Sequence, residues 1–320
     1  MPAIGMNPKQ METSTELRHE ELQQPPFNAT FVGAVVGAAR HYASSISASD
    51  FFCESGFAFA INMHPETCPS APYCWNHTSV LDCLRNLGIS ATHIPLQYPD
   101  GTTASASNVE EQARRAASEA ILSVEGLEHQ LVTGCDDEQF KLALPWGPDV
   151  PSCMTNVLYK DLNGDNPPVF GFYRFDQCDS VAKQSRILEG LKCALSMYQQ
   201  PSQFQMDGYT FGASAYKNWI TALESGNYEK QGHWWNAMVW AECRSYAAEY
   251  FKNWPQDPKN ETNELSTLYS QLSELLAQAS DNQLEDAEKA RLIGQASELE
   301  QCVPPLLQKV IEGIGVEVSR

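Results

Sequence analysis

The sequence predicts an α+β fold followed by an all-helical part. Residues 27–176 mix apolar helical segments with strand-like segments, whereas residues 177–320 show helical periodicity only. A hairpin pattern near residue 129 supports a sheet in the first part, and no repeat of 20–50 residues is evident. We therefore expect a flexible leader over 1–26, an α+β domain over 27–176 and a helical domain over 177–320.

The first predicted structured segment is a buried helix from Ala29 to Ala43. Residues 1–26 before it are polar, rich in Met and Gln, and end in Pro25-Pro26, which is typical of a flexible leader. Asn28 suits the N-cap position of the helix. Small residues on several of its faces indicate that neighbours surround this helix.

The next segments are expected to alternate between strand, loop and helix. An apolar segment after Gly56 has strand-like composition, and the proline-rich stretch 64–75 excludes helix and regular strand. Periodicity and breakers then predict a helix over 79–87 ended by Gly88, a strand over 91–96, an amphipathic helix over 109–124 and a strand over 169–175.

Residues 128–147 carry the clearest local pattern in the chain. They read as a strand that opens with His129, a tight turn at 134–137, a return strand, and then Pro145-Trp146-Gly147. After residue 177 the apolar periodicity predicts helices over 181–198, 211–225, 233–254, 264–279, 283–301 and 304–314.

Composition excludes several classes of partner and location. The formal net charge is −19, from 21 basic and 40 acidic residues, so the chain should repel nucleic-acid phosphates. We see no apolar run of ~18 residues and no signal-peptide pattern, so neither a membrane partner nor secretion is expected. The ten cysteines include no C-x-x-C pair. A cytoplasmic protein with reduced thiols is therefore predicted.

The order of segments also matches a known layout for acyl chemistry. In that layout a cysteine at the start of a buried helix attacks an acyl carbon, and a histidine on a facing strand serves as its base. A third polar group orients the histidine. This chain offers a buried helix first and the His129 strand later.

Four segments carry a family resemblance. They are Asn28 to Tyr42, Gly56-Phe-Ala-Phe59, His64 with Cys68-Pro-Ser-Ala-Pro72, and Val132-Thr-Gly-Cys-Asp-Asp137. These segments resemble proteins related to the N-terminal domain of butirosin biosynthesis protein H, a family similar to papain-like cysteine peptidases. The resemblance implies a papain-like fold, no cofactor, and an acyltransferase that moves an acyl group from a carrier protein to an amine. The helical segments 215–223 and 237–251 are also similar to regions that follow such domains.

The chain departs from the family at two site positions. Counting back from Arg40-His41-Tyr42 places Thr30 where the family has its nucleophilic cysteine. Pro145-Trp146-Gly147 is similar to a family turn, but Leu144 stands where the aspartate that orients the histidine would be. Asp136 or Asp137 could replace that aspartate only if the turn bends back.

Cys68 is an alternative nucleophile, because it follows His64 by four residues in a loop stiffened by prolines. Cys68 could instead be a small buried apolar residue in a cleft wall, the simpler interpretation. His64, Cys68, Cys74 and His77 are close in sequence, but their spacing matches no strong zinc pattern, and no metal site is predicted.

Trp235 lies on a helical face that could form a wall of a ligand pocket or join the two domains through an aromatic seam. Asn28, Trp146 and the Asp136-Asp137 pair are further candidates for contacts with substrate, although a polar turn also explains the two aspartates.

Three functions remain open from the sequence. The first is an acyltransferase or amide-forming enzyme of specialised metabolism that acts on a small amine or a carrier-bound acyl group. In it His129 is the base, Thr30 or Cys68 the nucleophile, and Asn28 or the Thr30 amide holds the oxyanion. The second is a papain-like fold without catalysis that binds a small molecule or a partner protein. The third is a peptidase.

Overall fold

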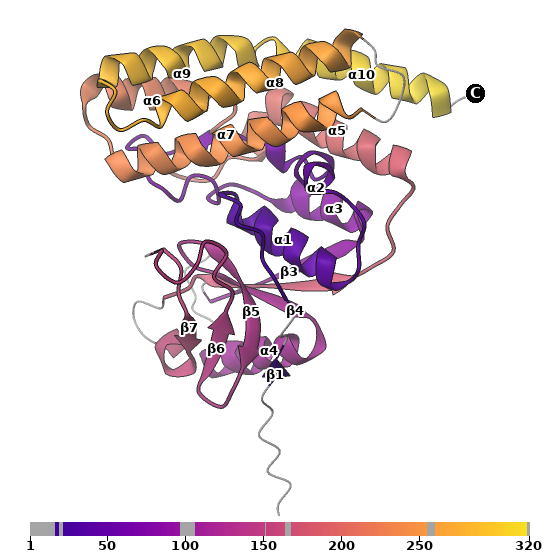
Figure 1. The fold of residues 1–320 in the computed structure, drawn as a ribbon, viewed down its shortest axis with the longest axis vertical. Coiled ribbons are helices and arrows are strands. Elements are labelled where there is room, and N and C mark those ends of the chain that lie inside the picture. The colour runs from indigo at the N-terminus through magenta and orange to yellow at the C-terminus, as the bar shows by residue number, and fades with distance from the viewer. Residues whose placement is uncertain are drawn as a thin grey trace, which may run out of the picture.

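The computed structural model describes residues 17–18, 22–96, 106–150, 152–163, 168–254 and 260–318. It has a mixed α+β fold with a sheet at one end and a layer of long helices at the other (Figure 1). None of the described helices combines the length and apolar composition needed to cross a bilayer.

The described strands form one main antiparallel sheet in the order β3-β8-β4-β5-β6-β7, with β1 added beside β5. Their bounds are β1 Leu17–Arg18, β3 Ile89–Pro95, β4 Ile121–Glu125, β5 His129–Cys135, β6 Gln139–Leu142, β7 Asn156–Leu158 and β8 Gly171–Gln177. The hairpin of β5 and β6 is present as predicted, and it contains a register shift between Val132 and Gly134. Strand β5 begins at His129.

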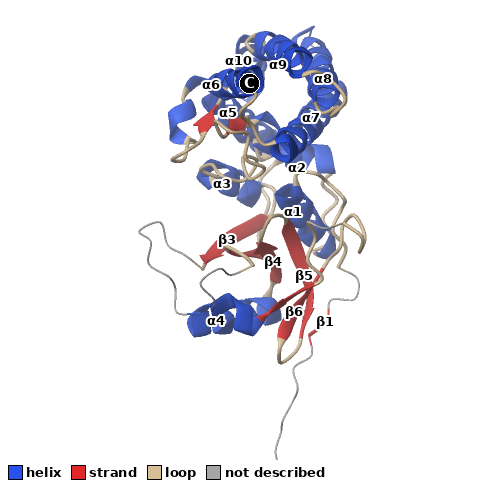
Figure 2. Ribbon diagram, turned by 90° about the vertical axis from the view of Figure 1, so that its left-hand side faces the viewer, coloured by secondary structure: helices blue, strands red, loops and turns tan. Residues whose placement is uncertain are grey.

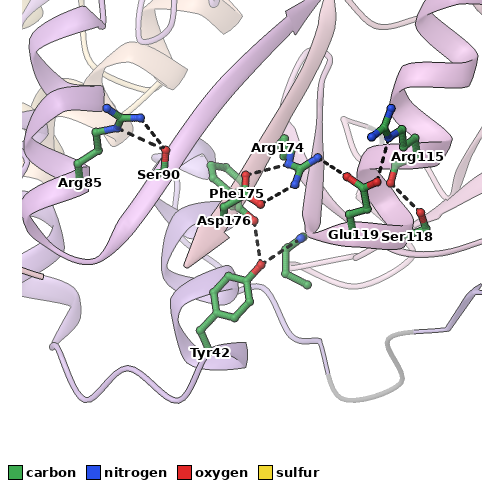
Figure 3. A network of polar contacts seen from close by, with 10 residues as sticks. Tyr42, Arg85, Ser90, Arg115, Ser118, Glu119, Arg174, Phe175 and Asp176 are labelled. Carbon is green, nitrogen blue, oxygen red and sulfur yellow. Dashed lines mark hydrogen bonds and ion pairs between the residues drawn. The ribbon is translucent and has the colours of Figure 1, made fainter. Parts of the chain in front are cut away.

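Helix α1, Thr30–His41, packs against one face of this sheet, and helix α4, Ala106–Glu119, covers the other (Figure 2). Every residue of α1 from Thr30 to Ala39 is buried, which confirms that neighbours surround it. Just after its end, Tyr42 accepts a hydrogen bond from Ile121 N–H and donates one to Phe175 O at 2.9 Å (Figure 3). Tyr42 therefore fastens the end of α1 to both β4 and β8.

Two sequence predictions in this part are wrong. The segment after Gly56 forms a 3-10 turn, η1 Phe57–Phe59, and only the short strand β2 Asn62–Met63, paired with β9 Thr210–Phe211. Gly56 has a φ of 86°, which bends the chain out of an extended path. The helix predicted over 109–124 ends at Glu119, because the buried residues that follow it belong to β4.

The helix α2 Ala48–Glu54, which begins with a capping box from Ser47 and Asp50, was missed from the sequence. The remaining helices follow the predicted periodicity, beginning with α3 Thr78–Asn86, which ends before Gly88. After the sheet come α5 Lys183–Gln199, α6 Ala213–Ser225, α7 Lys230–Lys252, α8 Asn260–Ala279, α9 Asp286–Glu300 and α10 Val303–Val318.

A single apolar cluster joins α1 and α2 to these later helices, while a second cluster lies between α4 and the sheet. Within the first cluster Arg244 is fully buried on α7 and donates to the carbonyl oxygens of Ala58 at 2.6 Å and Ala60 at 2.9 Å. It also pairs with Glu300 at 3.0 Å. One buried cation thus connects the 57–60 segment to the helical layer.

The predicted leader is partly packed. Leu22, Gln24 and Pro25 are buried, although they fall within the 1–26 segment expected to be flexible. The Gln24 side chain bridges β5, because it donates to His129 O at 2.8 Å and accepts from Leu131 N–H at 2.8 Å. Apart from β1, the leader before residue 22 lies outside the described residues.

Candidate ligand cleft beside the start of α1

A cleft of about 560 Å³ lies beside the start of α1. Its walls come from the turn between β4 and β5, the proline-rich loop over 68–74, and the first turns of α7. The larger apolar side chains that line it are Leu127, Trp146, Phe170, Trp234 and Trp235. Its polar lining includes Asn28, Cys68, Ser70, Tyr73, Cys74, Glu125, Glu128 and His129. The cleft therefore combines an aromatic wall with a small set of polar groups.

Thr30 is the first residue of α1, as the position of a helix-start nucleophile requires, but its side chain is closed in. The residue is completely buried and is not among those that line the cleft. Its hydroxyl donates to Glu128 Oε2 at 2.8 Å, accepts from His129 N–H at 3.0 Å, and lies 2.7 Å from the Tyr73 hydroxyl. This hydroxyl is a structural link between helix, hairpin and loop.

The first backbone amides of α1 are also occupied. Ala29 N–H donates to Glu242 Oε2 from α7 at 2.8 Å, and Thr30 N–H donates to the Tyr73 hydroxyl at 3.1 Å. The predicted N-cap at Asn28 is wrong, because Ala29 occupies that position and no side chain caps the helix from it. Side chains distant in sequence satisfy these amides instead. The Thr30 amide is therefore not free to hold an oxyanion.

Two carboxyl groups near the helix start bind protons more tightly than usual. Burial raises the pKa of Glu128 to about 8, and the hydrogen bonds from Thr30 and Tyr73 only partly offset it. Burial likewise raises the pKa of Glu242 to about 7. At neutral pH the Glu128 carboxyl is mostly protonated, so it is a poor base for the Thr30 hydroxyl.

The His129 ring lies in an aromatic surrounding. Its centroid is 5.2 Å from that of Phe31 and 4.9 Å from that of Tyr73. Among the described residues neither ring nitrogen has a hydrogen-bond partner. Burial lowers the pKa of His129 to about 4, although the charge of Glu125 opposes this. The imidazole is thus neutral at physiological pH and is bonded to neither Thr30 nor Cys68.

Glu125 lies directly opposite His129 in the antiparallel pair of β4 and β5, and opposite Gly171 in the pair of β4 and β8. A Cβ built at Gly171 would come within 2.8 Å of His93 Nε2. The missing side chain therefore leaves room for His93 to reach Glu125 Oε2, at 2.7 Å. Burial is the largest influence on Glu125 and opposes its ionisation, but the hydrogen bond with His93 and the charges of nearby histidines together outweigh it, so the pKa of Glu125 is lowered overall.

Cys68 and His64 have different hydrogen-bond partners. Cys68 lines the cleft, with its Sγ 2.9 Å from Ser70 Oγ, which in turn lies 2.8 Å from the Tyr209 hydroxyl. His64 is outside the lining, where its Nδ1 accepts from Glu66 N–H at 3.1 Å and its ring packs against Tyr209. No hydrogen bond joins His64 to Cys68 in the described part of the chain. The sequence spacing thus does not produce a thiol–imidazole pair.

The Asp136-Asp137 pair lies outside the cleft lining, in the turn at the far end of β5. Asp136 Oδ1 accepts from the N–H groups of Glu138 and Gln139, both at 3.0 Å. Asp137 is 77% exposed and 3.7 Å from Arg114. The two residues form the polar turn, and six residues of β5 separate them from His129. They therefore neither line the cleft nor orient His129.

Trp146 and Trp235, two candidates for substrate contact, do meet in the cleft wall. Their ring centroids are 5.8 Å apart in an edge-to-face arrangement, and Trp146 Nε1 donates to Pro26 O at 3.2 Å. Asn28 also lines the cleft. In the described part of the chain no three His, Cys, Asp or Glu side chains are arranged to hold a metal ion.

Several site residues were missed from the sequence. They are Tyr73, His93, Glu125, Glu128 and Glu242. Each reaches the site through a partner far away in the chain, such as Thr30 for Glu128 or Ala29 for Glu242. The one local signal was the turn over 126–128, which places Glu125 and His129 opposite each other.

Comparison with known proteins found no match in two searches. The chain matches no protein-family model and no curated protein. The geometry of the cleft is therefore the basis for assigning a function.

Proposed function

We propose that this protein is a papain-like fold whose cleft binds a small molecule with an apolar body, and that Thr30 is not a nucleophile. The packing of α1 against an antiparallel sheet supports the fold, with Thr30 at the helix start and His129 at the start of the facing strand. The observation that carries the proposal is the enclosure of the Thr30 hydroxyl next to an open, aromatic-walled cleft.

Catalysis through Thr30 lacks its necessary parts. A threonine hydroxyl is a weak nucleophile and needs a base within hydrogen-bond reach. Glu128 accepts a hydrogen bond from the Thr30 hydroxyl. Because its pKa is raised to about 8, its carboxyl is mostly protonated at neutral pH and does not remove the hydroxyl proton. The backbone N–H of His129 donates to the Thr30 hydroxyl, but the His129 ring does not bond to it.

Ligand binding fits the dimensions and the lining of the cleft. Pockets for small molecules usually measure ~300–1,000 Å³ and are mostly apolar with a few polar groups that fix orientation. This cleft has a volume of about 560 Å³, and three tryptophans contribute to its walls. Leu127 and Phe170, which also line it, are 69% and 64% exposed, so apolar surface is left uncovered there.

A titration with 2-naphthaleneethanol, a neutral aromatic probe, tests this proposal by isothermal calorimetry. We expect the wild-type protein to bind the probe and a Trp235→Ala variant to bind it at least about tenfold more weakly, since an aromatic contact is lost. Met206→Ala is the matched control, because Met206 is an exposed apolar side chain outside the cleft lining. Equal binding by the Trp235 variant, or absence of binding by this probe and by its naphthyl amine and carboxylate analogues, would refute the proposal.

One observation favours acyl transfer as a second function. Cys68 places a thiol in the cleft wall, with the hydroxyl of Ser70 beside it. Attack on an acyl thioester would form a Cys68 thioester and release the free thiol of the donor. A later attack by an amine would form an amide and return the Cys68 thiol.

Intact mass spectrometry after incubation with an acetyl thioester tests this second function. An enzyme acting through Cys68 would gain one acetyl group, and Cys68→Ser would gain none. Cys302→Ser is the control, because Cys302 is an exposed thiol remote from the cleft lining. Equal acetylation of several cysteines would indicate ordinary thiol reactivity and exclude a dedicated site.

A further inference from the structure

We infer that the cleft selects ligands whose polar group is a protonated amine, held between the Glu125 carboxylate and the imidazole of His129. This inference rests on the proposed function, because it requires that the cleft bind a small molecule. It concerns recognition only, since a protonated amine is not a nucleophile.

The charge of the cleft is the first observation. Its lining residues, all within the described part of the chain, include Glu125 and Glu128 but no lysine or arginine. Because the pKa of Glu128 is raised to about 8, its carboxyl is mostly neutral at physiological pH. Glu125 has a lowered pKa and is ionised. The cleft therefore presents one carboxylate that a monocation would complement.

The position of that carboxylate is the second observation. Glu125 and His129 face each other across the pair of β4 and β5, so their side chains project from the same face of the sheet. On the side of β8, Glu125 is hydrogen-bonded to His93, and the absence of a side chain at Gly171 makes room for this contact. Among the described residues His93 is the only side chain hydrogen-bonded to Glu125, so its carboxylate can accept a further donor.

The unpartnered imidazole is the third observation, and it is independent of the charge. His129 is only 1% exposed, lines the cleft, and has no hydrogen-bond partner at either ring nitrogen among the described residues. Buried polar groups nearly always have partners, so an unpaired imidazole indicates a missing one. Because its pKa is lowered to about 4, the ring keeps an acceptor nitrogen at neutral pH.

An ammonium group satisfies both acceptors at once. One N–H can donate to the Glu125 carboxylate and another to the free acceptor nitrogen of His129. The tryptophan faces in the wall add a favourable surrounding for a cation. A carboxylate ligand would instead face Glu125 with a like charge, and an alcohol would gain hydrogen bonds but no charge pairing.

Calorimetry with three matched probes tests the inference at pH 7: 2-(2-naphthyl)ethylamine, 2-naphthaleneethanol and 2-naphthaleneacetate. We expect the amine to bind about tenfold more tightly than the alcohol, and the acetate more weakly than both. Glu125→Gln should weaken binding of the amine more than binding of the alcohol, so that the two affinities converge. His129→Phe should weaken the amine more than the alcohol.

Glu274→Gln is the matched control, because it removes the same charge from an exposed position on α8, outside the cleft lining. If amine and alcohol bind equally, or if Glu125→Gln and Glu274→Gln weaken the amine equally, the inference is wrong while the proposed function stands. If none of the three probes binds, the proposed function itself fails. Titration of Glu125→Gln with the alcohol also serves as a test of folding, because a folded variant should still bind this probe.

Discussion

Thr30 shows how a single hydroxyl can fix the relation between three distant segments. It contacts the loop through Tyr73, the turn through Glu128, and β5 through the backbone of His129. All of these groups are buried or partly buried, so water does not readily replace a hydrogen bond lost from this hydroxyl, although Tyr73 and Glu128 also bond to each other at 3.2 Å. The residue at a presumed nucleophile position is thus used for stability.

Replacing Thr30 with valine should therefore destabilise the fold. Valine keeps the shape of threonine but leaves the groups around it without a hydroxyl partner, at a cost of roughly 1–3 kcal/mol in the free energy of unfolding. Thr30→Ser keeps the hydroxyl and should cost only about 1 kcal/mol for the lost methyl group. Urea denaturation followed by circular dichroism measures both. A valine variant as stable as the wild type would contradict this role.

Glu128 should make stability depend on pH between 7 and 8. In the folded protein its pKa is raised from 4.5 to about 8. The folded state therefore holds a proton that the unfolded chain has already released, and the resulting stabilisation is lost as pH rises. For a pKa near 8 the loss between pH 7 and 8 is about 1 kcal/mol.

Glu128→Gln should remove this part of the dependence of the unfolding free energy on pH, because the glutamine side chain does not titrate. Glu125→Gln is the control, since the lowered pKa of Glu125 keeps it ionised throughout that range. Urea denaturation at pH 7.0, 7.5 and 8.0 gives the slopes. An unchanged slope in Glu128→Gln would show that the Glu128 carboxyl is already ionised at pH 7.

The first turn of α7 forms one wall of the cleft and lies tightly against the proline-rich loop. A Cβ built at Gly232 would be 1.9 Å from Thr67 O, so only glycine fits there without movement. Asn236, one turn further on, donates to Cys68 O at 3.0 Å. Backbone contact and side-chain bond together set the distance between the loop and the tryptophans of α7.

Gly232→Ala should push α7 away from the loop, reduce the free energy of unfolding by roughly 1–3 kcal/mol, and weaken binding of naphthyl probes. Gly294→Ala on α9 is the matched control. Its nearest neighbour would be 4.0 Å from the new Cβ, so alanine should be neutral or stabilising there. Thermal unfolding and calorimetry test both effects. A Gly232→Ala variant with wild-type stability and affinity would contradict this prediction and show that the proline-rich loop can move aside at little cost.

Local sequence patterns predicted the hairpin and most of the helices, though not α2, because apolar periodicity and turn residues act over short distances. They failed where distant groups decide the outcome. Asn28 has the chemistry of an N-cap, yet Glu242 and Tyr73 satisfy the helix amides from far along the chain. Likewise, the surroundings of His129 depend on Glu128, Tyr73 and Phe31, whose meeting no local pattern encodes.

The arrangement of the core bears on how the whole chain unfolds. One apolar cluster extends from α1 and α2 into the helical layer, and Arg244 bonds across it to Ala58 and Ala60. The boundary predicted at residue 177 therefore separates the α+β part from the all-helical part, but residues on both sides of it belong to one apolar core. Two parts that bury each other's apolar surface should lose their structure together.

Urea unfolding should accordingly show one transition. Tryptophan fluorescence and far-UV circular dichroism should give the same midpoint, and hydrogen exchange should show β5 and α8 losing protection together. Two separate midpoints would establish independently stable domains on either side of residue 177.

The enclosure of position 30 also determines how a cysteine would behave there. Thr30→Cys would not produce a reactive thiolate. The thiol would meet the protonated Glu128 carboxyl and the Tyr73 hydroxyl in a buried site, with no imidazole nitrogen bonded to it. Burial without a cationic partner keeps a thiol protonated. A nucleophile at position 30 would require changes at Glu128, Tyr73 and the His129 ring as well, so a single substitution there should not create one.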